Sequence, residues 1–413
     1  MRNASTRLTA LVATLASLDL ALWLVIVPLL PALEQEAGLS KDQAGIVLAA
    51  YSASVLLASL PVGHLSDRLG ARRMTVAAAF MFAALAPALA FADSFGELVA
   101  VRFGQGLFSA VSWTAGLAWL TQSQPVDRRA RSLATVNVAA ALAPLAGPIL
   151  GGPVVAAFGL GVTLAAFGAV VLCVAVWALL EPGPGRPPPA ASGDAPERTG
   201  TPLLAGTRSE PRLRASMVAI GLAASTAGVI QLLAPLHLDD QGFSQSEIGW
   251  VFTGTAAASM LVTLTMRRLT DRVDRLRTAI RSLSLVCGVL GLLLLGLPTG
   301  VYVAALVALT MAQAPVWVLS YPLCSEGAQR AGVGQGVAMG ALNTVWAVGA
   351  LAAPAAAGLI AEATSDRAAY GVALAVVLGG VALLVQARRQ DQRRSASSAG
   401  VVTGRRQANR SHT

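Results

Sequence analysis

Long apolar segments constrain this chain more than any other feature of its sequence. Of its 413 residues, 55% are hydrophobic and 12% are charged, and the mean hydropathy is +0.65. Too few polar side chains remain to cover a soluble protein of this length. Apolar segments of about 20 residues match a helix that crosses the hydrocarbon core of a membrane. Helix is also the open-ended structure that satisfies its own backbone hydrogen bonds there.

The apolar segments number twelve, and short clusters of charged residues separate them. They predict an all-α membrane protein with twelve transmembrane helices. The predicted spans are 8–31, 43–62, 74–92, 98–120, 133–157, 161–180, 215–238, 245–266, 278–298, 301–322, 335–361 and 368–387.

The basic residues are distributed as membrane topology requires. The net charge is +9, and 27 of the 30 lysine and arginine residues lie in the tails and the even-numbered connections or at their edges. The odd-numbered connections hold Lys41 and Arg367 together with ten acidic residues, counting Glu247 at the edge of a span. The positive-inside rule therefore places both termini in the cytoplasm, and no nucleic-acid partner is needed to explain the charge. Arginine outnumbers lysine 29 to 1, which favours a bacterial plasma membrane as the location.

One connection differs from the others because its composition cannot pack into a core. Residues 181–214 contain eight prolines and scattered charges, which is typical of a linker. The predicted domains are an N-terminal six-helix bundle (1–180), this cytoplasmic Pro-rich linker (181–214), a C-terminal six-helix bundle (215–387) and a disordered basic cytoplasmic tail (388–413).

The two halves of the chain contain an internal repeat. A constant offset of 204 pairs residues of helices 1 and 2 with residues of helices 7 and 8, and an offset of 206 pairs helix 5 with helix 11. The matches predict two bundles of like orientation, related by an axis along the membrane normal, with a cavity between them. The matched pairs are Pro31 with Pro235, Gly38 with Gly242, Ser40 with Ser244, Gly45 with Gly249, Leu65 with Leu269, Asp67 with Asp271, Arg68 with Arg272, Asn137 with Asn343, Pro148 with Pro354 and Gly152 with Gly358.

The connection after helix 2 carries a motif. Its sequence, Gly63-His64-Leu65-Ser66-Asp67-Arg68-Leu69-Gly70-Ala71-Arg72-Arg73, resembles the Gly-x-Leu-x-Asp-Arg-x-Gly signature of the major facilitator superfamily. The resemblance implies a gating loop in which Gly63 permits close helix approach and Asp67 accepts hydrogen bonds across the bundle interface. Arg68 and Gly70 complete the motif, and Arg72 and Arg73 anchor the loop at the cytoplasmic face. A plain turn carrying topology charges is the alternative. The second copy, Leu269 to Arg272, lacks both glycines.

Helix 5 contains a second motif, Gly147-Pro148-Ile149-Leu150-Gly151-Gly152. It resembles the antiporter motif of the same superfamily, although Ala143 replaces the usual leading glycine, and the resemblance implies export by exchange. Proline bends a helix and glycine lets a neighbouring helix approach, so this segment could seal the pathway against ion leak. A role in helix packing alone is the alternative.

Asp19 is the one carboxyl group deep within a predicted span. A charged side chain at mid-bilayer costs about 2.5 to 3.5 kcal/mol on insertion scales and therefore marks a functional site by default. Protons and a bound cation would compete for this group, which is what an exchanger requires. We expect Asp19 to lie in a hydrated cleft where the bundles meet; a buried structural hydrogen bond is the alternative. The helix resembles helix 1 of drug:proton antiporters and vesicular monoamine transporters.

Helix 4 carries a polar stripe in which Arg102, Gln105, Ser109, Trp113 and Gly116 share one face. The segment resembles the superfamily's helix 4 signature, in which the arginine is linked to proton transfer. Arg102 is thus the expected electrostatic partner of Asp19, with a structural charge as the alternative. Weaker cavity candidates, which could equally bond a neighbouring helix, are Asn137, Gln231, Gln313, Trp317 and Asn343.

These features together favour a secondary active transporter of the major facilitator superfamily rather than an enzyme. Lys41 has no glycine-rich context for a nucleotide, and the three histidines are dispersed, so we expect no cofactor and no metal. We expect export of a small amphipathic or cationic compound by proton antiport with alternating access. Proton-coupled uptake and a non-transporting receptor are the alternatives. The expected partners are the substrate, protons and the lipid bilayer, with the chain as a monomer.

Overall fold

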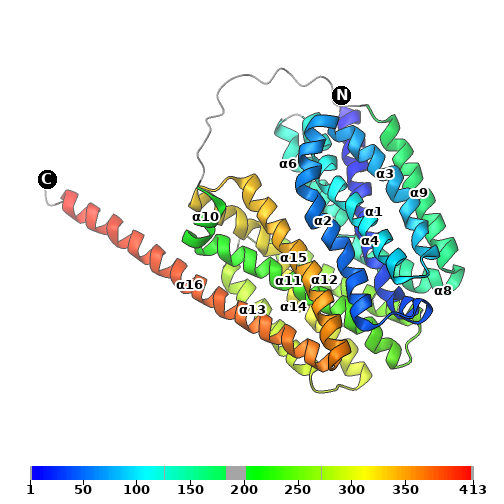
Figure 1. The fold of residues 1–413 in the computed structure, drawn as a ribbon. Helices are drawn as coiled ribbons and strands as arrows, with labels where there is room; N and C mark the ends of the chain where they lie inside the picture. Colours follow the sequence, from blue (N-terminus) through cyan, green and yellow to red (C-terminus); the bar gives the residue numbers. More distant parts are fainter. Residues whose placement is uncertain (1, 125, 183–200, 271, 411–413) are drawn as a thin grey trace.

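The computed structural model describes residues 2–124, 126–182, 201–270 and 272–410, and these residues are almost entirely helical (Figure 1). The first half contains α1 (Arg2–Ala37), α2 (Lys41–Leu69), α3 (Ala71–Ala88), η1 (Leu89–Phe91), α4 (Phe95–Val111), η2 (Ser112–Gly116), α5 (Leu117–Ser123), α6 (Val126–Ala140), α7 (Ala143–Ile149), η3 (Leu150–Val154), α8 (Val155–Phe158) and α9 (Leu160–Leu180). The second half contains α10 (Leu203–Ser209), α11 (Pro211–Asp240), α12 (Gln245–Leu269), α13 (Arg275–Leu293), α14 (Thr299–Ala331), α15 (Gln335–Ala363) and α16 (Asp366–Arg410).

The described helices match the predicted spans. Eleven described segments are long and apolar enough to cross a membrane. The remaining predicted span, 98–120, corresponds to α4, η2 and α5, where a π-helical turn interrupts the α-helix and Arg102 adds a charge. The twelve-helix, all-α architecture is therefore confirmed.

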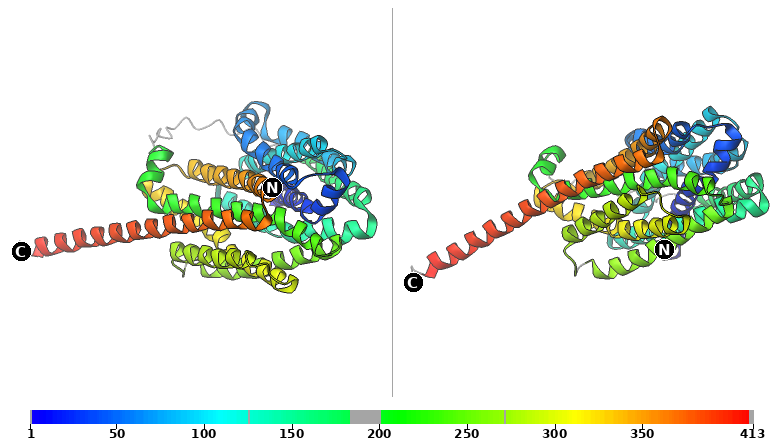
Figure 2. Two further views of the ribbon diagram at one scale, coloured as in Figure 1. Left: turned by 60° about the horizontal axis from the view of Figure 1, so that its bottom comes forward. Right: turned by 90° about the horizontal axis from the view of Figure 1, so that it is seen from below.

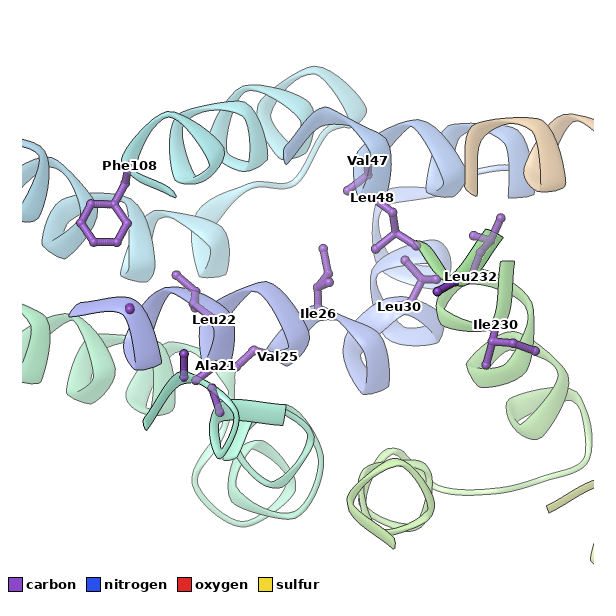
Figure 3. Packing of buried hydrophobic residues seen from close by; sticks show 14 of the residues in the cluster. Ala21, Leu22, Val25, Ile26, Leu30, Val47, Leu48, Phe108, Ile230 and Leu232 are labelled. Atoms are coloured by element: carbon purple, nitrogen blue, oxygen red, sulfur yellow. The ribbon is translucent and has the colours of Figure 1, made fainter. Parts of the chain in front are cut away.

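The helices form two bundles, α1–α9 and α11–α16, that lie side by side (Figure 1). Buried apolar side chains of both bundles belong to one large cluster. Figure 3 shows part of it, where Leu22, Ile26 and Leu30 of α1 lie near residues of α2, α4 and α11.

Residues paired by the repeat adopt the same local structure. Gly38 and Gly242 both have positive φ angles, of 61° and 84°, a region that favours glycine. The next pair, Ser40 and Ser244, precedes the first residues of α2 and α12, and each backbone N–H donates to the side chain three residues on, at 3.2 and 2.8 Å. The repeat therefore builds the same turn twice.

The bundles contact each other at the end of the molecule that contains these two turns, here called the distal end. Side chains bond across the interface there, with Gln35 donating to Asp239 at 3.0 Å and Lys41 pairing with Asp366 at 2.8 Å. The opposite, terminal end contains the start of α1 and the end of α9. At the terminal end, each ion pair found among the described residues joins segments of one bundle, as Arg7 does with Glu181 at 3.1 Å.

At the distal end the bundles touch at two equivalent places, and glycines allow the close approach at both. In one place α2 packs on α15, and in the other α12 packs on the α7–η3 segment. A Cβ atom on Gly249 of α12 would lie 2.7 Å from the carbonyl oxygen of Pro148. A Cβ atom on Gly45 of α2 would overlap the carbonyl oxygen of Pro354. Because Gly45 and Pro354 are the repeat partners of Gly249 and Pro148, the same contact occurs on both sides of the interface.

Two segments differ from their expected conformation. Residues 388–410, expected to be disordered, continue α16 as a helix that projects beyond the bundle (Figures 1 and 2). Polar contacts fix the start of this extension, since Asp391 accepts hydrogen bonds from Arg212 at 3.0 Å and pairs with Arg330 at 3.1 Å. In the predicted linker, 203–209 form the short helix α10, and 183–200 lie outside the described residues.

We expect Gly249→Val to prevent distal closure, because overpacking at a tight helix contact costs about 1 to 3 kcal/mol. The distance between spin labels at Glu36 and Asp240, measured by pulsed electron resonance, should lengthen in this variant. Gly254→Val is the matched control on the same helix, since a Cβ atom there meets nothing within 4 Å. Equal distances in both variants would contradict the proposed contact.

Candidate functional site

Asp19 lies midway along α1 and is completely buried. Three side chains donate hydrogen bonds to its carboxyl group: the Tyr51 hydroxyl at 2.9 Å, the Ser109 hydroxyl at 2.7 Å and the Trp113 indole N–H at 3.0 Å. A carboxylate satisfied by three donors is stable without water. The protein therefore supplies the hydrogen bonds that the hydrocarbon core does not.

A glycine contact brings Tyr51 into this site. Gly106 of α4 faces α2 so closely that a Cβ atom on it would overlap the Tyr51 carbonyl group. Because α2 and α4 approach there, the Tyr51 side chain reaches Asp19 from one side while Ser109 reaches it from α4. Trp113 reaches Asp19 from the π-helical turn η2, and such turns often occur at functional sites.

Arg102 belongs to the same buried group but does not bond directly to Asp19 in the described contacts. Its Nη1 donates to Gln105 at 3.0 Å, and its guanidinium carbon lies 5.1 Å from the centre of the Tyr51 ring. Nε and Nη2 of Arg102 are buried with no partner among the described protein groups. The Tyr51 ring thus lies within reach of both the charge of Arg102 and the carboxyl of Asp19.

Aromatic rings connect this buried group to the interface between the bundles. The Trp23 ring stacks on Tyr51, with centroids 6.1 Å apart, and meets Trp346 of α15 edge-on at 6.0 Å. Trp23 and Trp346 also line a small pocket between the bundles, of about 10 Å³. That volume is close to the minimum that holds one water molecule. The other residues that line this interface pocket are Leu48, Ala224, Ala227, Gly228, Gln231, Trp317, Ala350 and Pro354.

The expected position of Asp19 in a hydrated cleft between the bundles is therefore wrong for this conformation. Asp19 lies inside the N-terminal bundle, because its three donors come from α2 and from the α4–η2 segment of that bundle. Trp23, four residues further along α1, occupies the interface instead. A sequence pattern gives the depth of a side chain in the membrane but not the direction in which the helix turns it.

The weaker cavity candidates separate into different environments. Gln231 and Trp317 line the interface pocket. Gln313 is buried and donates to the backbone carbonyl of Ala223, as a helix-to-helix bond would. Asn343 is exposed and does not belong to the pocket lining, and the side chain of Asn137 lies outside the described residues.

The predicted gating loop is mostly helical, because α2 continues to Leu69 and turns at Gly70, where φ is 91°. The close helix approach expected at Gly63 is not found, since the nearest atom to a Cβ there, from Thr114, is 3.9 Å away. Arg72 donates to the carbonyl oxygen of Glu181, the residue that follows α9, at 2.9 Å and to that of Leu179 at 2.6 Å, and so fixes α3 to the end of α9.

Arg68 and Arg73 of the same loop are exposed at the terminal end. The side chain of Asp67 lies outside the described part of the structure, as does the residue Asp271 that the repeat pairs with it. The bond that Asp67 would make across the interface therefore stays a prediction.

The second motif lies where α1, the α7–η3 segment and α12 meet. A Cβ atom on Gly147 would lie 2.7 Å from the Ala21 carbonyl oxygen, and one on Gly151 would lie 2.9 Å from Pro28. Gly152 faces Gly249 of the other bundle. The motif glycines thus pack α1 on one side and the C-terminal bundle on the other. The segment also contains a second π-helical turn, η3. Pro148 lies in α7 just before this turn, and Pro153 lies within it.

Sequence reasoning missed Tyr51, Trp23 and Trp346 as members of the site. Trp23 could have been found, because it lies one helical turn from Asp19. Tyr51 carried a weaker signal as a tyrosine within an apolar span, and nothing in the sequence shows that α15 brings Trp346 to Trp23.

Comparison with known proteins identifies the family. The model of the Major Facilitator Superfamily matches residues 9–339, so the chain belongs to this superfamily and is a membrane transporter rather than an enzyme. Multidrug resistance protein MdtL of Escherichia coli is 27% identical over 56% of this chain and 59% of its own length. An uncharacterized MFS-type transporter of Schizosaccharomyces pombe is 33% identical over 34% and 33%. The chain therefore spans between a third and three fifths of the length of these curated relatives.

Solved structures show the same fold at low sequence identity. A bacterial homologue of the human lysosomal transporter Spinster, in an inward-facing and unoccupied conformation, superposes with a TM-score of 0.76, 14% identity and coverage of 94% of this chain and 98% of that one. The nucleoside transporter NupG superposes with a TM-score of 0.70, 13% identity and coverage of 92% and 99%.

We expect Asp19→Ala to destabilise the protein more than Asp19→Asn. Alanine leaves three donors without an acceptor, at about 1 to 3 kcal/mol for each buried group left unsatisfied, whereas asparagine keeps one acceptor oxygen. Thermal unfolding of the purified variants in detergent measures the difference. Unfolding of both variants at the wild-type temperature would show that the hydrogen bonds from the three donors to Asp19 do not stabilise the protein.

Proposed function

We propose that this transporter exports a small amphipathic or cationic compound in exchange for protons. The observation that carries the proposal is the completely buried carboxyl group of Asp19, joined through Tyr51 to Trp23 at the bundle interface. A buried acid in a membrane helix marks an ion pathway by default. The aromatic contact gives a compound at the interface a physical route to that acid.

The exchange follows from competition between two ligands. Trp23, Trp317 and Trp346 offer ring faces, which attract cations and flat apolar groups, and Gln231 adds a polar group. A compound that enters between Trp23 and Trp346 must press the Trp23 ring toward Tyr51, whose hydroxyl donates to Asp19. A closer hydrogen bond from Tyr51 stabilises the charged carboxylate and so lowers its affinity for a proton. Binding at the rings and proton binding at Asp19 then oppose each other, and the effect is reciprocal.

The direction of transport rests on the glycine-rich motif and on topology. Gly147 and Gly151 pack against α1 and Gly152 faces α12, so the segment can keep the distal end sealed while the other end exchanges ligands. With the termini in the cytoplasm, as the basic residues indicate, the distal end faces outward. Rocking of the two bundles would then alternate access, with the Gly63 to Arg73 loop as the gate at the cytoplasmic side. The partial match to MdtL, a multidrug resistance protein, supports efflux as the physiological direction.

The decisive experiment compares wild type with Asp19→Asn in proteoliposomes under an imposed pH gradient, using a panel of amphipathic and cationic dyes. We expect proton-driven dye transport to fall by about tenfold or more, since a change of 1.4 kcal/mol in coupling is already tenfold. Asp93→Asn, at an exposed carboxyl group of the distal end, is the matched control.

Unchanged transport by Asp19→Asn would contradict the proposal. Dye movement in the same direction as the protons, lost in the same variant, would identify uptake by symport instead of export.

The aromatic connection generates a separate expectation. Trp23→Leu should weaken dye binding about threefold to tenfold, because an aromatic pair contributes about 0.5 to 1.5 kcal/mol beyond its buried area. The dye-induced release of protons, measured with a pH indicator in weakly buffered detergent solution, should fall further than binding does. Trp250→Leu, at a tryptophan that is 57% exposed on α12, should change neither measurement. Equal effects of the two variants would show that Trp23 does not connect the sites.

A further inference from the structure

A second and much larger cavity lies on the outer side of the N-terminal bundle, away from the interface. This lateral groove has a volume of about 890 Å³ and runs between α1, the α6–α8 segment and α9. It is lined by Ala10, Ala13, Thr14, Ser17, Leu18, Ala21, Ala139, Leu142, Ala143, Ala146, Leu150, Val154, Phe158, Val162, Thr163, Ala166, Phe167 and Val170. All of these residues belong to segments long and apolar enough to span a membrane, so the groove opens toward the bilayer.

The groove and the buried acid use different faces of α1. The groove-lining residues of α1 recur at spacings of three and four from Ala10 to Ala21, which places them on one stripe of the helix. Asp19 lies outside that stripe and faces α2 and α4. The groove is therefore not an extension of the Asp19 site.

The polar groups in the groove are already satisfied. The three hydroxyl groups donate to carbonyl groups of their own helices: Thr14 to Ala10 at 2.9 Å, Ser17 to Ala13 at 2.8 Å and Thr163 to Gly159 at 2.8 Å. No charged side chain lines the groove. A polar or ionic ligand would lose its hydration here without gaining partners, so the groove suits a purely apolar occupant.

The shape of the groove indicates what kind of apolar molecule it can hold. Its floor contains small side chains that are buried, such as Ala13, Ala21 and Ala143. Its rims carry large exposed side chains on two different segments, with Leu142 after α6 54% exposed and Val170 of α9 51% exposed. A trough of small residues between bulky rims fits a long, thin and flexible apolar chain.

We propose that the lateral groove is a binding site for one acyl chain of a membrane phospholipid. The bilayer is the medium that the groove faces, and its acyl chains are the apolar molecules of this shape that are present throughout that depth. Contact along the trough buries more of an acyl chain than a flat helix face does, so this chain exchanges more slowly than the surrounding lipid.

The site lies directly behind the segment that closes the distal end. Ala143, Ala146 and Leu150 line the groove from α7 and η3, whereas Gly147 and Gly151 of the same segment pack on α1. A chain in the groove would therefore contact this segment directly. The inference depends on the membrane location of the chain and not on proton exchange.

The test uses the full chain in liposomes that contain a phosphatidylcholine with a photoreactive diazirine on one acyl chain. After illumination, mass spectrometry identifies the crosslinked peptides. We expect crosslinks to concentrate on groove peptides of α1, α7 to η3 and α9. Ala166→Phe, which fills the trough from α9, should lower this yield about tenfold.

Ala165→Phe is the matched control, because Ala165 is exposed on the same helix but does not line the groove, and its yield should equal that of wild type. Ala146→Phe fills the trough from the opposite wall and should reproduce the loss, so the result does not depend on one substitution. Even labelling around both bundles, or full yield in both filling variants, would overturn the proposal. Protection of the groove in a dimer seen by light scattering would also overturn it and would identify a second copy of the chain as the occupant.

Discussion

The absence of water from the hydrocarbon core is the constraint on which the rest of this structure depends. Every backbone group must be bonded within a helix, which produces the long apolar helices. A carboxyl group placed in that core must receive its hydrogen bonds from neighbouring side chains. Tyr51, Ser109 and Trp113 provide them to Asp19, so three segments of the N-terminal bundle are fixed relative to each other around a single acid.

Close backbone contacts govern how the two bundles meet. Gly249 against Pro148 and Gly45 against Pro354 are repeat-related, and each permits an approach that a methyl group would prevent. Such contacts depend on steric fit rather than on hydrophobic attraction, since lipid tails are as apolar as the helices. These glycine contacts can separate without exposing charge, whereas the ion pair between Lys41 and Asp366 beside them must break when the bundles move apart.

Asp19 and the bundle interface are separate regions, and this separation limits how substrate binding could be coupled to proton binding. Asp19 is shielded in one bundle, whereas the interface pocket is lined mainly by aromatic and small apolar residues. The stacked pair of Trp23 and Tyr51 bridges the two regions. Under the proposed function, substrate and proton need not touch the same atoms, and movement of aromatic rings replaces direct competition for one carboxylate. Such an arrangement tolerates substrates of varied shape, because ring faces impose little directional demand.

The sequence by itself determined the elements of the fold and the depth of the key residues. Hydropathy and charge gave the spans, and the spacing of Gly38, Ser40 and Gly45 against their partners gave the two-bundle repeat, because these properties depend on local composition and order. The stripe from Arg102 to Trp113 also followed from helical periodicity. The tertiary structure alone decided that Asp19 turns inward to Tyr51, that Trp23 meets Trp346, and that α16 continues as a helix beyond the bundle. Those outcomes depend on helix rotation, on the contact between bundles and on ion pairs between residues far apart in the chain, none of which a local pattern encodes.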